Sequence, residues 1–305
     1  MATKTILDST LTAIANAIRA KTGKSATMTP LEMPDEIESI SGGGGSDENF
    51  KKALEGDITN DVTQCVTEVV LPSGLSRVRT AAFYKGRFKK ITWPSDVTAI
   101  ADETFRECRI KDGVVFTGPI TDIAQNAFYS TIFDNIDFVV PGSNAQHRAY
   151  SYINGNAFYA VSGLHSITLG SPDYGYKFSG NSCFRNAGAT LKEATVYIYD
   201  TNNYFSGIFD GCSGLEKIKL ALTTNYASAN PQGISQNCFR NCSNCLVYDF
   251  TGWPIVPTLA STNAFTNINA NAKIVVPDAL YNDWVAATNW STYASYIIKE
   301  SDYAA

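Results

Sequence analysis

The sequence predicts a repeat solenoid rich in short β-strands and turns, with a small amino-terminal helical module before it and a capping helix at its carboxy-terminal end. Three observations predict this fold class: a phenylalanine-centred unit recurs eight times in 305 residues, a run of glycines sets residues 1–41 apart, and an amphipathic segment follows the last unit. A self-similar period of roughly 20 to 50 residues is typical of stacked repeat architectures.

Residues 1–41 predict two short helices. Leu11, Ile14 and Ile18 recur at helical spacing, and Gly23 ends this first helix. Thr29-Pro30-Leu31-Glu32 has the pattern of a capping box with proline at the first helical position. Helices this short bury too little surface to fold well alone. We therefore expect Leu11, Ile14 and Ile18 to form an anchoring or self-association interface.

A linker follows in residues 42–49, because the consecutive glycines at 42–45 can neither pack nor hold a helix. It separates the anchoring module from a solenoid expected over residues 50–277.

The solenoid is defined by phenylalanines that span 182 residues in seven intervals, a mean of 26. One such unit cannot bury its own ring, but stacked units can pile the rings into a continuous core. The alternative, a chance rhythm in an ordinary sheet domain, does not account for the other positions that repeat in phase. The expected core rings are Phe83, Phe105, Phe128, Phe158, Phe184, Phe209, Phe239 and Phe265.

Other positions of the unit repeat with the phenylalanine. A small residue precedes it, as at Ala127 and Cys183, an apolar residue lies five positions upstream, as at Ile100 and Ile234, and a cysteine often lies three positions downstream. Apolar runs that favour β-strands then follow. They are residues 90–93, 137–140, 166–169, 195–198, 217–220 and 273–276.

Residues 278–305 predict the cap. Leu280, Trp284 and Ala287 share one face of a helix and can cover the open end of the core.

The units Ile234-Ser-Gln-Asn-Cys-Phe-Arg-Asn-Cys-Ser243 and Ile100-Ala-Asp-Glu-Thr-Phe-Arg-Glu-Cys108 resemble the BspA-type leucine-rich repeat, over roughly residues 76–277. The segment from Lys273 to Trp290 is similar to the helix that closes such arrays. The intervals of 30 residues before Phe158 and Phe239 depart from the pattern. The resemblance implies irregular repeats there, with extra residues that bulge to one face.

Residues 11–23 and 28–34 resemble a short module at the head of tail and baseplate proteins of phages and prophages of Gram-positive bacteria. Together the two resemblances imply a structural or receptor-recognition part of a phage tail, baseplate or related particle, assembled in the host cytoplasm. Its partners would be other tail or baseplate proteins, a host cell-surface glycan or protein, and further copies of the same chain.

Composition argues against several partner classes. A net charge of −5 disfavours nucleic acid, which requires a concentrated basic patch. The one basic cluster, Lys85, Arg87, Lys89 and Lys90, is expected to be a solvated face. No apolar run is long enough to span a bilayer, and the amino terminus lacks the apolar stretch of a signal peptide.

No catalytic, metal or cofactor site is expected. Cys238, Cys242 and Cys245 have the spacing of an iron–sulfur motif, but Cys238 and Cys242 also occupy repeat positions that point into the core. His147 and His165 are the only histidines, and neither lies in a nucleophile or metal motif.

Aromatic residues outside the core positions are candidates for a recognition surface, because flat rings can stack on sugars or fill a protein interface. The alternative is that they pack between repeats. The candidates are Trp93, Tyr174, Tyr176, Tyr199 and Tyr226, with Tyr197 beside them.

Three functions remain open at this stage: the phage-particle component, a bacterial leucine-rich-repeat adhesin or binding module, and a glycan-cleaving enzyme. A defined oligomer through residues 1–41 would favour the first over the second, and turnover of a cell-wall or capsular polysaccharide would favour the third.

Overall fold

The computed structural model describes residues 62–142, 151–200, 205–226 and 233–303. The anchoring residues Leu11, Ile14 and Ile18, the linker at 42–49 and most of both long inter-repeat insertions lie outside this part of the chain.

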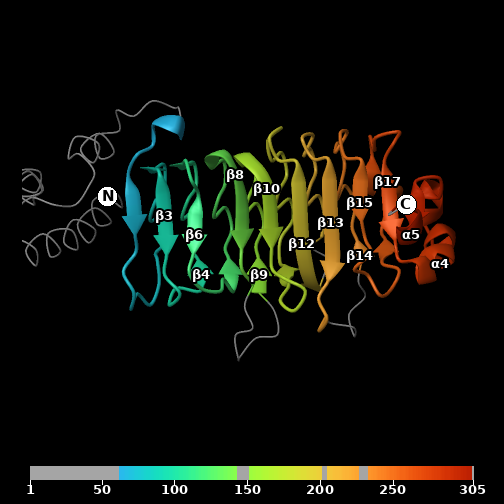
Figure 1. Ribbon diagram of the computed structural model, residues 1–305, viewed down its shortest axis with the longest axis horizontal. Coiled ribbons are helices and arrows are strands. Elements are labelled where there is room, and N and C mark those ends of the chain that lie inside the picture. The colour runs from blue at the N-terminus through green and yellow to red at the C-terminus, as the bar shows by residue number, and fades with distance from the viewer. Residues whose placement is uncertain (1–61, 143–150, 201–204, 227–232, 304–305) are drawn as a thin grey trace, which may run out of the picture.

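The described residues form a parallel β-solenoid in which successive turns of chain stack along one axis (Figure 1), as the repeat predicts. The described part of the chain begins with the 3-10 helix η1 (Val62–Gln64), and a sheet of three strands follows. That sheet contains β1 (Glu68–Val70), β3 (Lys90–Trp93) and β6 (Val114–Phe116).

A 13-stranded sheet runs along the rest of the solenoid. Every strand pair in it is parallel, and neighbouring strands belong to consecutive turns. Its main path contains β2 (Arg87–Phe88), β5 (Arg109–Ile110), β8 (Ile132–Val140), β10 (Ser162–Leu169), β12 (Glu193–Asp200), β13 (Lys217–Leu222), β15 (Val247–Asp249), β17 (Lys273–Val276) and β18 (Ile297–Lys299).

Short strands form further parallel pairs beside the main path. They are β4 (Ala99–Ile100), β7 (Asp122–Ile123), β9 (Ser151–Ile153) and β11 (Tyr176–Phe178), with β14 (Gly233–Ile234) pairing separately with β16 (Thr258–Leu259). The strands β4, β7, β9 and β14 contain the apolar position five residues before the phenylalanine, and Ile100, Ile123, Ile153 and Ile234 are buried in them.

The eight repeat phenylalanines form one column of stacked rings. Neighbouring ring centroids lie 4.9–6.0 Å apart, and the interplanar angles are 5–29°. Seven of these rings are buried, whereas Phe83, at the amino-terminal end of the column, is half-buried. Each buried ring contributes about 1.5–3 kcal/mol by the apolar area that it removes from water.

Tight turns hold each ring in the column. From Phe83 to Phe239, the residues two positions before and two positions after each phenylalanine have φ between 52° and 75°. Glycine and asparagine tolerate this left-handed conformation best, and they fill many of these positions, as at Asn186, Gly211 and Asn241.

A ladder of backbone hydrogen bonds joins the turns of consecutive repeats. The N–H of each phenylalanine from Phe83 to Phe239 donates to the carbonyl of the residue just before the next phenylalanine, at 2.7–3.0 Å. The N–H two positions further along donates to the residue just after the next phenylalanine, at 2.8–3.0 Å. These N–H groups of each turn therefore find their hydrogen-bond acceptors in the neighbouring repeat.

The carboxy-terminal cap contains the expected helix together with further short elements. It contains η4 (Asp278–Leu280), α4 (Tyr281–Ala286), η5 (Trp290–Tyr293) and α5 (Glu300–Tyr303), with β18 pairing to β17, while η3 (Thr262–Phe265) belongs to the last repeat. Ala287 has an extended backbone, which ends α4. Trp284 and Trp290 are buried, and Trp290 packs on Phe265 at the end of the ring column.

Candidate functional site

Trp93 does not belong to a recognition surface, contrary to the prediction. Its side chain is fully buried, and the indole N–H donates to the carbonyl of Val97 at 2.7 Å. The ring packs edge-on against Phe105 with centroids 5.6 Å apart. Ile91 lies two positions earlier in β3 and also faces the core, so the alternation of the strand turns Trp93 inward.

Tyr176 is a second correction, because it too is fully buried. Its hydroxyl donates to the carbonyls of Ile120 and Pro141, at 3.1 and 3.3 Å. Burial raises the pKa of this phenol far above its ordinary value. Tyr176 therefore stabilises the contact between three turns and contributes nothing to the surface.

The other predicted tyrosines are half-buried at one end of neighbouring strands. Tyr174 lies in a bulge after β10, closed by two hydrogen bonds with Ser171. The carbonyl of Pro172 in that bulge accepts the N–H of Thr224, two residues before Tyr226. Tyr199 lies near the end of β12, and Gly175 packs closely against its backbone nitrogen.

Tyr226 lines an uncharged groove of about 650 Å³ next to the cap. Leu222, Pro254 and Leu280 contribute apolar walls, and Thr224 and Thr251 contribute hydroxyls. Both hydroxyls are engaged, with Asp173 and Asp249 respectively.

A larger polar surface lies along the turns, at a repeat position that the sequence analysis passed over. From Phe83 to Phe239 the residue directly after each core phenylalanine is polar, and all of these residues except the buried Asp210 are exposed or half-buried. We call these residues the tyrosine–arginine row. Its members are Tyr84, Arg106, Tyr129, Tyr159, Arg185, Asp210 and Arg240.

Aromatic and guanidinium groups alternate in the amino-terminal half of the row. The Arg106 guanidinium lies 5.8 Å from the Tyr84 ring centroid and 5.2 Å from that of Tyr129. Tyr129 stacks on Tyr159 with centroids 5.0 Å apart and an interplanar angle of 5°. The ring faces thus support one another, and the row exposes ring edges, hydroxyls and the guanidinium.

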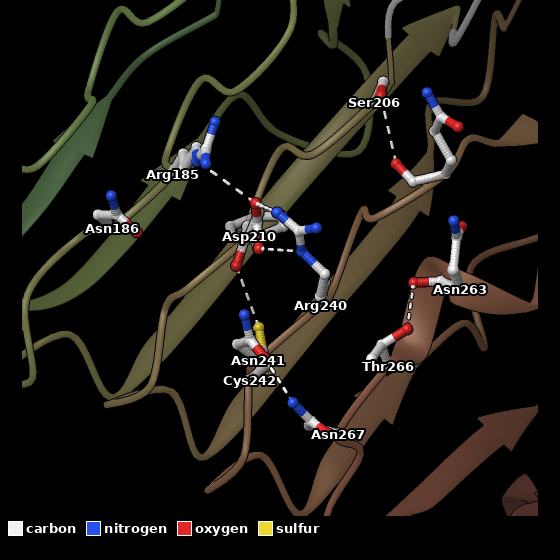
Figure 2. Close-up of polar contacts among 12 residues, drawn as sticks. Arg185, Asn186, Ser206, Asp210, Arg240, Asn241, Cys242, Asn263, Thr266 and Asn267 are labelled. Atoms are coloured by element: carbon white, nitrogen blue, oxygen red, sulfur yellow. Dashed lines mark hydrogen bonds and ion pairs between the residues drawn. The ribbon is translucent and has the colours of Figure 1, made fainter.

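The carboxy-terminal half of the row centres on one buried carboxylate. Asp210 accepts hydrogen bonds from Nε and Nη2 of Arg240, at 2.9 and 2.6 Å, and lies 3.3 Å from Nε of Arg185 (Figure 2). The Asp210 side chain is 6% exposed, whereas those of Arg185 and Arg240 are 43% and 35% exposed. One carboxylate therefore orients two accessible cations.

The ion pairs stabilise the charged form of two arginines in the row. Hydrogen bonding to Glu103 raises the pKa of Arg106, and hydrogen bonding to Asp210 raises the pKa of Arg240. Tyrosine and arginine are, with tryptophan, the side chains enriched at binding hot spots. Because stacking and ion pairs already restrict their rotamers, binding costs little further entropy. The row is the best-organised candidate site of the described surface.

The described residues contain no group of three or more His, Cys, Asp or Glu side chains that could hold a metal ion. Cys238, Cys242 and Cys245 are buried free thiols, and desolvation raises the pKa of each. The Cys242 thiol donates to the carbonyl of Phe209 at 3.1 Å, and Cys212 and Cys108 make the same bond to the phenylalanine of the preceding repeat.

His165 lies beside a carboxylate and a hydroxyl on the exposed sheet face. Its Nδ1 is 2.9 Å from Oδ1 of Asp137, and Oγ of Ser166 donates to the same oxygen at 2.6 Å. These two bonds lower the pKa of Asp137, the serine bond most. Since the hydroxyl bonds to the carboxylate and not to the imidazole, the order differs from that of a Ser-His-Asp relay.

Within the described ranges, none of the helices has the length and apolar character required to cross a membrane.

Comparison with known proteins identifies the repeat. The family model of the BspA type leucine-rich repeat region matches residues 61–152 and 145–267, in six copies. A solved leucine-rich repeat protein from Eubacterium ventriosum ATCC 27560 is 14% identical over 68% of this chain and 87% of that chain, with a TM-score of 0.23. None of the curated proteins matches.

Proposed function

Because the chain belongs to the BspA-type leucine-rich repeat family, we propose that its repeat domain is a bacterial binding module of the adhesin kind. Its partner docks on the tyrosine–arginine row and undergoes no reaction there. The observation that supports this proposal is the repetition of an outward tyrosine or arginine in consecutive turns, held by stacking and by ion pairs. A long, rigid and partly cationic surface suits an extended partner at a cell surface.

The test is adhesion. Beads that carry the full chain are mixed with Gram-positive bacterial cells and with mammalian epithelial cells, and bound beads are counted. We expect adhesion to one of these surfaces, and a loss of about ten-fold or more when Tyr129→Ser and Tyr159→Ser are combined. Circular dichroism checks that the variant is folded.

The matched control replaces Tyr197 and Tyr199 with serine, which removes two half-buried tyrosines from the sheet face. If this control loses adhesion while the row variant retains it, the tyrosines of β12 are the binding surface and the row is not. Beads that adhere to neither cell type refute the binding function.

A second, finer candidate is the receptor-recognition part of a phage tail or baseplate. It is supported by the resemblance of residues 11–23 and 28–34 to tail-protein modules and by the glycine run behind them. Under this proposal the amino-terminal helices bind other tail proteins or further copies of the chain, and the repeat domain faces the host.

Light scattering of the full chain tests this candidate. We expect a defined oligomer that dissociates when Leu11→Asp and Ile18→Asp are combined, while the melting temperature of the repeat domain stays the same. A monomeric parent chain contradicts the particle role and leaves the adhesin proposal in place.

A further inference from the structure

A charged pocket adjoins the amino-terminal end of the tyrosine–arginine row. It has a volume of about 500 Å³, and we call it the Arg87 pocket. Three consecutive repeats line this pocket, and each contributes two residues at equivalent positions. The residues two positions after the phenylalanine are Lys85, Glu107 and Ser130, and those four positions after it are Arg87, Arg109 and Ile132.

Strand register places two guanidinium groups side by side in this pocket, because Arg87 of β2 pairs with Arg109 of β5. Like charges on directly neighbouring strand positions destabilise a sheet. Other repeats have a small polar residue at the position of Arg87, such as Ser162, Ser213 and Ser243. The paired arginines are therefore a local departure from the repeat and not a requirement of the fold.

The carboxylate in the pocket does not neutralise Arg87. Glu107 lies 3.5 Å from Nζ of Lys85 and 3.3 Å from Nε of Arg106. Among the described residues, Arg87 forms no ion pair, and its buried Nε has no hydrogen-bond acceptor. A buried donor without an acceptor is costly, and an anionic oxygen removes that cost.

Lys85 completes the arrangement. Hydrogen bonding with Tyr84 and the Glu107 carboxylate raises its pKa, so that it stays charged beside the row. The neighbouring cations Lys89 and Arg106 are engaged elsewhere, with Glu68 at 2.7 Å and with Glu103.

We propose that the Arg87 pocket binds an anionic oxygen group, carboxylate or phosphate, of a polymer that lies along the tyrosine–arginine row. This inference rests on the proposed binding function and names its ligand class: an acidic surface polymer. Lys85 and Arg87 bind the anion, and the hydroxyls and guanidinium of the row bind the adjoining part of the polymer.

Calorimetric titration of the full chain tests the proposal with three probes: polygalacturonate, polyphosphate and neutral dextran. We expect at least one polyanion to bind and dextran not to bind. The tighter polyanion distinguishes a carboxylate from a phosphate ligand. Affinity should weaken with salt, as it does when a polyanion releases counterions.

The decisive variant combines Lys85→Asn with Arg87→Ser. Asparagine suits the left-handed backbone of Lys85 and stands at the equivalent positions Asn186 and Asn241, while serine is the usual residue at the position of Arg87. We expect an affinity loss of about ten-fold or more, and a salt dependence lower by about two counterions.

The control combines Lys217→Asn with Lys273→Ser, which changes net charge equally on the sheet face. Equal affinities of parent, pocket variant and control overturn the proposal, as does the absence of polyanion binding. If bead adhesion then still depends on Tyr129 and Tyr159, the proposed binding function is supported and only the anion-binding role of the Arg87 pocket is refuted. If polyanion binding depends on Arg87 but the beads do not adhere, the anion-binding role of the pocket is supported and the adhesin role is refuted.

Discussion

Individual phenylalanines carry a large part of the stability of this domain. Phe184 is buried with a stacked ring on either side, Phe158 at 5.0 Å and Phe209 at 5.1 Å. Phe83 has only one such neighbour in the column and is half-buried. The same residue type should therefore contribute unequally along the stack.

Phe184→Ala should lower the free energy of unfolding by about 3–5 kcal/mol, because it leaves a ring-sized cavity between two rigid neighbours. Phe83→Ala should cost clearly less. Urea denaturation followed by circular dichroism measures both, and equal losses would show that the column does not act as a shared core.

Buried thiols give the domain a dependence on alkaline pH. Burial raises the pKa of Cys108 from 9.0 to about 12. Above pH 9 the unfolded chain releases this proton while the folded chain keeps it, so stability is lost as the pH rises toward 12. Below pH 9 both states hold the proton, and the thiol adds no pH dependence.

Between about pH 9 and 12, Cys108 should reduce stability by about 1.4 kcal/mol per pH unit. Cys108→Thr tests this, because Thr131 occupies the same repeat position and its hydroxyl donates to the Phe105 carbonyl. The variant should show a shallower decline of unfolding free energy with pH than the parent. Identical slopes would mean that Cys108 ionises normally in the fold.

Strand alternation could have assigned the predicted aromatic residues correctly from the sequence. Trp93 lies two positions after Ile91, and Tyr176 two positions before Phe178, so each shares the inward face of its apolar neighbour. The same rule turns Tyr199 outward, one position after buried Ile198. Aromatic character alone was a poor guide, since a tyrosine hydroxyl can be satisfied by core carbonyls.

Among the structural elements, the left-handed turns are the least optimised. Asn267 donates from Nδ2 to Oδ1 of Asn241 at 2.7 Å, so asparagines at equivalent positions of adjacent turns bind each other (Figure 2). Ala160 occupies the same position with φ of 52° and lies one repeat before Asn186. An alanine in this conformation is strained and offers no side-chain hydrogen bond.

Ala160→Asn should raise the unfolding free energy by about 1 kcal/mol, through relief of strain and a new bond to Asn186. The reverse change, Asn186→Ala, should lower it by about 1–2 kcal/mol, since it also removes a hydrogen bond to the Tyr159 hydroxyl at 3.3 Å. Thermal melts report both signs. If both variants shift the melting temperature in the same direction, the geometry of these turns does not limit the stability of the domain.

At this scale the periodicity predicted much and missed one position. The expected strands at residues 90–93, 166–169 and 217–220 are present, because repeats that stack their rings also bring equivalent apolar runs side by side as parallel strands. The tyrosine–arginine row was visible in the same alignment, at the residue after each phenylalanine. Its members share polar character and not one residue type, so no single letter recurs in the alignment.

At the scale of the whole molecule, the stability of the repeats depends on how the ends of the stack are covered. Each repeat contacts chiefly its neighbours, so stability is close to a sum of repeat and interface contributions. The carboxy-terminal end is covered by Trp290, which packs on Phe250 and Phe265 and donates from Nε1 to the carbonyl of Pro257 at 2.7 Å.

Trp290→Ala should lower stability by about 3–5 kcal/mol, and the effect should be graded along the chain. Hydrogen exchange should show lost protection at Tyr248 and Ile274 but unchanged protection at Ile91. Uniform loss of protection would mean that the solenoid unfolds as one cooperative unit.

The exact form of the cap could not be predicted from helical periodicity. Leu280 and Trp284 do lie at helical spacing, but Ala287 leaves the helix and the chain returns as β18. The open edge of the sheet at β17 also needs a cover, and a further strand provides it by pairing with the free backbone groups. The spacing of apolar residues in the sequence does not show whether a strand or a helix will follow.

The hydrogen-bond ladder of the turns has a direction, since each unit donates its N–H groups to the next and accepts from the one before. Every internal unit therefore has the same connections on both sides, whatever its neighbours are. Duplication of one unit of about 26 residues would be accepted without redesign and would add one outward side chain to the row. The number of repeats alone therefore sets the length of this surface and the number of contacts that it offers to an extended polymer. In the same way, the number of binding units sets the valency of a linear receptor.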